Sequence, residues 1–298
     1  KLKYYCKVLN YQGFKNHNYD IRMIDLVLAE ASRTTYKKEA AIQIYYHGVR
    51  TLLSLEHEDS FEALKILLPL HCHDFALNEM QNMFVLTRNF CIKKMNKGQG
   101  AYYAKELLQI YKIEIQEAVI LVNNTLPAAT CRNIVVAATL CKELAWTAQF
   151  LLQFKTHIDT EVFSFNMAFV RFYQQKYKDA FTLLSQTHFT EVLMLLAAKG
   201  LLLKTYYELY LNYEDNFEYE DQLELYLHSF SVFLKRKKEI LTKRYIYYSN
   251  MVAMVKQLFN ITKELHLEEK KLLSLQEQLQ NTVEVAEKRW LRKKLAEL

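Results

Sequence analysis

The spacing of apolar and polar residues predicts a chain that is helical almost throughout. Apolar side chains recur at intervals of three and four, as they do on the buried face of an amphipathic helix. Ile21, Ile24, Leu28 and Ala31 follow this spacing, and Asp20 before them is suited to capping a helix. The same pattern predicts helices over 1–14, 21–33, 40–55, 60–68, 75–95, 101–121, 132–144, 146–154, 189–209, 223–233, 240–265 and 267–298.

Breaks between these helices are few, which favours an all-α fold. The chain has only 5 Gly and 2 Pro among 298 residues, whereas a β-rich protein of this length needs many more turn residues. The clearest break is at residues 97–100, with the sequence KGQG. We therefore predict a helical array over 1–265, with 97–100 as a candidate internal boundary, followed by an amphipathic segment over 266–298.

The segment 166–184, NMAFVRFYQQKYKDAFTLL, reads as a helix, a tight turn and the start of a second helix. Ala168 and Ala180 are small where two helices would approach most closely, and Tyr177 shares a face with Ala180. A weak repeat supports the same unit, because Leu144 and Tyr177 are 33 residues apart, as are Leu151 and Leu184. A period of about 33 or 34 residues with two helices per unit is typical of tetratricopeptide-type arrays.

On these residues the chain resembles the tetratricopeptide repeat (TPR) family. Ala168 falls at the small position of the first helix, and Tyr177 and Ala180 fall at the Tyr-x-x-Ala of the second. The segment 133–151 matches less well, with Leu144 in place of Tyr and Thr147 in place of Ala. Arg171 stands where an aromatic residue is usual, and the Pro that usually closes a unit is absent. The residues expected to pack the repeats are Ala168, Tyr177, Ala180, Leu184 and Leu144.

The phrases YYAKELLQIYKIEIQEAV and LLLKTYYELYL also resemble a group of bacterial TPR-like proteins that carries no known activity. The resemblance implies a right-handed α-solenoid of antiparallel helix hairpins and a bacterial origin. It further implies a concave groove that binds a protein or peptide partner. A non-catalytic protein–protein interaction scaffold is therefore the expected function.

Charge adds one alternative, nucleic-acid binding through the basic C-terminal helices. The net charge is +6, which is mild, but basic residues gather at 235–244 and 288–294. Tyr245, Tyr247, Tyr248 and Trp290 lie beside them and could stack on bases. Because cations also favour helix C-termini and solvated faces, we expect these residues to be surface charges and not a nucleic-acid site.

The 5 cysteines, Cys6, Cys72, Cys91, Cys131 and Cys141, are odd in number and form no C-x-x-C. In apolar helices a free thiol behaves as a small buried hydrophobe, so we expect a reducing, cytoplasmic location. No apolar run reaches the roughly 20 residues that a membrane-spanning helix needs.

His71, Cys72, His73 and Asp74 are the densest group of side chains able to bind a metal. Zinc needs ligands around a tetrahedron, usually as two pairs, and the sequence has no matching second pair. We therefore interpret this stretch as an interhelix loop and expect no metal ion and no cofactor. No H-E-x-x-H motif or nucleophile elbow is present, so we expect no enzymatic activity.

An apolar stripe runs along the predicted helix 267–298, and its members are Leu272, Leu275, Leu279, Val283, Ala286 and Trp290. A single stripe must be buried somewhere. We expect the segment to fold back as a cap on the array, with the break from the preceding helix at His266, which makes the protein a monomer. The alternative is a two-chain coiled coil, which would make it a dimer.

Overall fold

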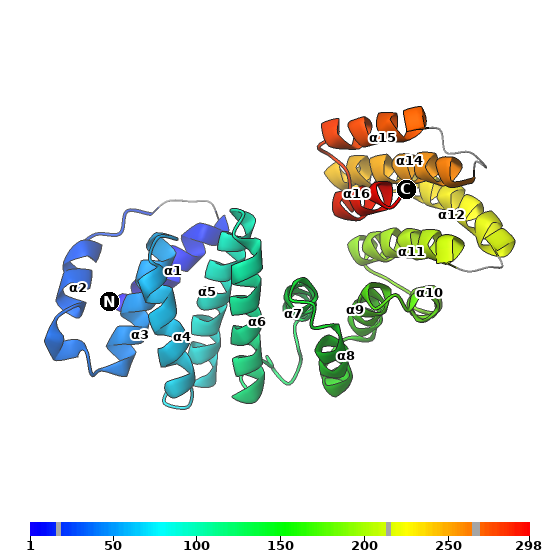
Figure 1. Cartoon of the computed structure of the whole chain (residues 1–298). Coiled ribbons are helices and arrows are strands. Elements are labelled where there is room, and N and C mark those ends of the chain that lie inside the picture. The colour runs from blue at the N-terminus through cyan, green and yellow to red at the C-terminus, as the bar shows by residue number, and fades with distance from the viewer. Residues whose placement is uncertain (16–18, 213–215, 264–268) are drawn as a thin grey trace. The chain divides into compact units, whose positions relative to one another are not determined.

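The computed structural model describes residues 1–15, 19–212, 216–263 and 269–298 (Figure 1). These residues form sixteen α-helices and two short 3-10 helices, and no strand is found among them apart from an isolated bridge between Val122 and Thr125. The prediction of an all-α fold is confirmed. No helix in the described part of the chain has the length and apolar character needed to cross a membrane.

The chain divides into two compact units, residues 1–166 and 167–298. The first unit contains α1 (Leu2–Lys15), α2 (Ile24–Ala31), α3 (Ala40–Leu53), α4 (Glu58–Leu70), α5 (Leu77–Asn96), α6 (Gly100–Gln116), α7 (Ala128–Leu140) and α8 (Leu144–Gln153), with 3-10 turns at Thr34–Tyr36 and Lys155–His157. Helix α9 (Thr160–Tyr173) contains the division. The second unit continues with α10 (Tyr177–Gln186), α11 (Val192–Asn212), α12 (Asn216–Arg236), α13 (Lys238–Leu241), α14 (Lys243–Lys263), α15 (Glu269–Asn281) and α16 (Lys288–Ala296).

In the first unit the helices from α2 to α8 each pack against the next helix in the chain. Helices α3 to α6 lie side by side, and α3 also packs on α1 and on α5 (Figure 1). Aromatic side chains join three of them: Phe61 on α4 stacks on Phe90 of α5 at 4.9 Å, and Tyr103 of α6 lies 5.9 Å from Phe61. All three are buried, so the aromatic residues fill the space between stacked helices.

In the second unit α11 packs on α10 and α12, and α14 packs on α12, α15 and α16. One close approach depends on a glycine. A Cβ placed on Gly200 of α11 would lie 2.7 Å from Cε1 of Tyr248 on α14, which is closer than two carbons tolerate. The absence of a side chain at Gly200 therefore lets α11 and the Tyr248 ring come together.

The turns at the two best candidate repeats have the same geometry. Lys142 and Gln175, 33 residues apart, both adopt left-handed backbone conformations, with φ of 62° and 60°. The hydrogen bonds around them match: Glu143 N donates to Ala138 O, and Lys176 N donates to Arg171 O, in the pattern of a Schellman turn. Helices α8 and α10 then begin 33 residues apart and are each 10 residues long.

The residues expected to pack the repeats differ in burial. Ala168 and Ala180 are fully buried, Leu184 is 4% exposed, and Leu144 and Tyr177 are half-buried. Their role in stacking repeats stays a prediction.

The expectation of one long helix over 267–298 is wrong. Helix α15 ends at Asn281 and α16 begins at Lys288, and Val283 between them is 80% exposed instead of belonging to a buried stripe. The connection is held by tertiary contacts, because Ala286 N donates to Tyr247 O of α14 and Asn250 Nδ2 of α14 donates to Glu284 O. The predicted break at His266 lies outside the described residues.

Smaller differences concern helix ends. The helix predicted to reach residue 121 ends at Gln116, because Ala118 adopts a left-handed conformation with φ of 56°. Pro69, expected to end its helix, lies in the last turn of α4, which ends one residue later at Leu70. The stretch between the predicted helices 189–209 and 223–233 is partly helical, since α11 continues to Asn212 and α12 begins at Asn216.

Candidate functional site

A groove of about 370 Å³ lies in the first unit and is lined by α1, α3 and α5. Three asparagines line it, Asn10 on α1 and Asn78 and Asn82 on α5. The last two are four residues apart, which places them on one face of α5. All three are exposed, and none has a side-chain hydrogen bond to another residue in the part of the chain that the structure describes. Each amide therefore offers a donor and an acceptor to a ligand in the groove.

Charged groups at the rim of the groove make it slightly basic. Lys3 Nζ lies 2.6 Å from Glu79 Oε2, and the hydroxyl of Tyr45 donates to the other oxygen of Glu79. These two hydrogen bonds lower the pKa of the Glu79 carboxyl, so it stays ionised and held by its neighbours. Lys7 adds a second positive charge to the lining. The groove thus carries two cations against one carboxylate.

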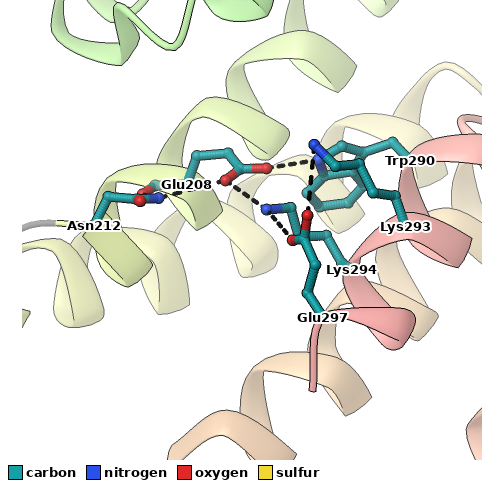
Figure 2. Close-up of polar contacts among 6 residues, drawn as sticks. All are labelled: Glu208, Asn212, Trp290, Lys293, Lys294 and Glu297. Atoms are coloured by element: carbon teal, nitrogen blue, oxygen red, sulfur yellow. Dashed lines mark hydrogen bonds and ion pairs between the residues drawn. The ribbon is translucent and has the colours of Figure 1, made fainter.

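A buried polar network in the second unit attaches α16 to α11 (Figure 2). Glu208 of α11 accepts a hydrogen bond from Trp290 Nε1 at 2.9 Å and one from Lys294 Nζ at 2.7 Å. Lys294 also lies 2.8 Å from Glu297, and Asn212 Nδ2 lies 3.5 Å from Glu208 Oε2. Burial acts to lower the pKa of Lys294, but its hydrogen bonds with Glu208 and Glu297 outweigh burial and raise it.

A second charge pair lies one helical turn away on α11. Lys204 is 1% exposed, and its Nζ is 2.6 Å from Glu287 Oε2, at the start of α16. The same ammonium lies 4.9 Å from the ring centroid of Phe172, a cation–π distance. Lys204 and Glu208 are four residues apart and so share one face of α11. Lys204 is paired with Glu287 and Glu208 with Lys294, so this network positions the α16 segment on α11.

The contacts of α16 bear on the expected cap and on the nucleic-acid alternative. The segment folds back onto α11 within its own unit, and its role as a cap on the array stays a prediction. Trp290 is only 7% exposed and packs at 5.5 Å against the ring of Tyr207, so it is not placed to stack on bases. Lys294 is buried in the network. The other basic group stays at the surface, with Lys235, Arg236, Lys238, Lys243 and Arg244 all exposed.

The metal-capable loop lies between α4 and α5, and the structure brings a third residue to it. Donor atoms of Cys72, His73 and Glu117 all lie within 4.8 Å of one another. Glu117 directly follows α6 and is 44 residues from His73, so sequence spacing did not reveal it. His71 and Asp74 instead pair with each other, at 2.7 Å from Nδ1 to Oδ2. The expectation that this loop binds no metal rests on residues 71–74 alone, and Glu117 adds a candidate ligand from outside that stretch.

Comparison with known proteins identifies no relative of this chain. No family model, no curated protein and no solved structure matches the chain.

Proposed function

We propose that this protein is a non-catalytic scaffold of the TPR-like type, whose α1/α3/α5 groove binds an extended segment of a partner protein. The observation that carries the proposal is the set of three exposed amides, Asn10, Asn78 and Asn82, beside Lys3 and Lys7. Amides can donate to and accept from a peptide backbone, and the excess positive charge favours an acidic segment.

The proposed architecture is a right-handed superhelix of antiparallel hairpins. Its support is the repeated turn at Lys142 and Gln175, with the same hydrogen bonds and the same 33-residue offset. Packing of each helix on its near neighbours in the chain is also what a repeat array requires. The five free cysteines favour a reducing, cytoplasmic location, and the α16 contacts with α11 favour a monomer.

The test compares two double variants of the full chain. Asn78→Ala with Asn82→Ala removes the groove amides of α5. Gln149→Ala with Gln153→Ala is the matched control, since these are exposed amides four residues apart on α8 of the same unit. Each protein is used as bait in lysate of the source cell, and captured proteins are quantified by mass spectrometry. Candidate segments are then synthesised and their affinities measured by fluorescence anisotropy.

We expect at least one captured segment to bind the native chain and the α8 control equally, and the groove variant at least about 10-fold more weakly, a loss of about 1.4 kcal/mol. Segments that bind both variants equally would contradict the groove. Capture of nucleic acid that depends on Lys235 and Arg236 would favour the alternative function instead.

A further inference from the structure

The turn after α4 and the end of α6 bring together three different metal-binding atoms. The Cys72 thiol, a ring nitrogen of His73 and a carboxylate oxygen of Glu117 lie within 4.8 Å of one another, and His73 Nε2 is 3.0 Å from Glu117 Oε2. We propose that these three residues bind a Zn²⁺ ion.

The separations suit a zinc ion with little rearrangement. Zinc lies about 2.0 to 2.3 Å from nitrogen, oxygen and sulfur ligands, so the ligands of a tetrahedral ion are about 3.3 to 3.6 Å apart. The His73 and Glu117 atoms are already slightly closer than this, and no pair in the set is farther apart than 4.8 Å. Shifts of about 1 Å therefore place all three around one ion.

The backbone holds two of the ligands in a closed turn and the third at a helix end. Cys72 N donates to Pro69 O, and Asp74 N donates to His71 O, so the turn is tied to the last residues of α4. Glu117 N donates to Ile113 O, which fixes Glu117 at the end of α6. Because α5 packs against both α4 and α6, the two ligand-bearing segments belong to one packed body. Such support keeps ligands in place before the ion arrives.

The donor set selects for zinc over harder cations. A thiolate is a soft ligand that suits Zn²⁺, whereas Mg²⁺ and Ca²⁺ prefer oxygen ligands. When Cys72 binds as thiolate and Glu117 as carboxylate, their two negative charges balance one divalent ion. Cys72 is 3% exposed, whereas the His73 side chain is 73% exposed. The ion can therefore enter from the solvent side, past the exposed imidazole.

The ion would join the α4–α5 turn to α6 and so stabilise the first unit. Three protein ligands leave one tetrahedral position for water or another ligand. The zinc site is separate from the proposed groove, whose lining contains none of these three residues.

The experiment titrates reduced, chelator-treated full-length protein with ZnCl₂ by calorimetry and, separately, with CoCl₂ by absorption spectroscopy. The variants are His73→Ala and Glu117→Gln. His228→Ala and Cys141→Ser are the controls, because they remove an exposed imidazole and a half-buried thiol elsewhere. Circular dichroism without metal checks that each variant is folded, and His73 is exposed enough that its replacement leaves the core intact.

We expect one Zn²⁺ per chain, and Co²⁺ spectra with four-coordinate visible bands and a thiolate-to-cobalt charge-transfer band in the near ultraviolet. Each ligand variant should bind Zn²⁺ at least about 10- to 100-fold more weakly, the loss that even an outer-shell change causes. Zinc should raise the melting temperature of the native chain and of both controls, but not of His73→Ala. Binding that is absent at micromolar concentration, equal in all variants, or without a thiolate band would overturn the site.

Discussion

Lys294 Nζ on α16 lies 2.7 Å from Glu208 Oε2 on α11, although 86 residues separate them in the chain. Only 9% of the Lys294 side chain and 3% of the Glu208 side chain are exposed. A buried pair of this kind gains little over a well-packed apolar pair, but either charge alone is strongly destabilising. The pair therefore makes one position of α16 on α11 much more favourable than shifted ones.

Replacing Glu208 with Ala should destabilise the second unit by about 3 kcal/mol, because Trp290 Nε1 loses its acceptor and the Lys294 ammonium keeps only Glu297, whose side chain is 44% exposed. Urea unfolding in a Trp146→Phe background measures this loss, since Trp290 is then the single tryptophan and it hydrogen-bonds to Glu208. Lys293→Ala on the same helix is the control. Its side chain is 66% exposed, so we expect a change below about 1 kcal/mol. Equal effects of the two substitutions would contradict a specific role for the buried pair.

Replacing Ala180 with Leu should cost about 1 to 3 kcal/mol, because the added methylenes have no space. Ala180 is fully buried on α10, which packs against α11. Gln186→Leu, at an exposed position on the same helix, provides the comparison. Thermal melting followed by circular dichroism measures both. An unchanged midpoint for the Ala180 variant would mean that the helices are not in close contact there.

Glu114 should make the first unit less stable as pH rises from about 4.5 to 7. Burial raises the pKa of this carboxyl from 4.5 to about 7, although Arg88 acts in the opposite direction. Arg88 Nη1 is 3.1 Å from Glu114 Oε2, but that oxygen receives no aligned hydrogen bond. The folded chain therefore keeps a proton that the unfolded chain releases within this window, so the stabilisation is complete at low pH and is lost as pH rises.

Urea unfolding of the native chain and of Glu114→Gln is measured at several pH values across this range. Both carry Trp290→Phe, so that the fluorescence of Trp146 alone monitors unfolding. The difference between their free energies of unfolding should change by on the order of 3 kcal/mol across this range, because the native chain becomes less stable relative to Glu114→Gln as pH rises. Glu62→Gln, whose side chain is 50% exposed, should follow the native curve. Parallel curves for the native chain and Glu114→Gln would show that Glu114 titrates normally.

All five cysteines should be titratable as free thiols in denaturant without reductant, and only one should react quickly in the native protein. Cys141 is half-buried, while the other four are buried. Burial raises the pKa of Cys6 and of Cys131 to about 12, so neither forms the reactive thiolate at neutral pH. A chromogenic thiol reagent counts both populations, and Cys141→Ser should remove the fast one. A count of fewer than four thiols in denaturant would contradict the proposed location in a reducing compartment.

The helices could be predicted because burial on one face leaves a periodic trace in the sequence, as it does along 75–95, where α5 forms. Contacts between distant residues leave no such trace. Glu117 reaches His73 only because α4, α5 and α6 pack together, and nothing at either position marks the other. In the sequence, apolar residues keep helical spacing from 272 to 290. The chain is nevertheless not helical between α15 and α16, because Ala286 and Glu284 form hydrogen bonds with α14 in place of helical ones.

The distance along the chain between α11 and α16 also matters while the protein is being made. Ribosomes add about 5 to 20 residues per second, so the 86 residues from Glu208 to Lys294 take roughly 4 to 17 s. For about that long Lys204 and Glu208 are outside the ribosome before Glu287 and Lys294 emerge. We expect the nascent second unit to keep this face of α11 hydrated and accessible to chaperones, and to close only after residue 294 has left the ribosome.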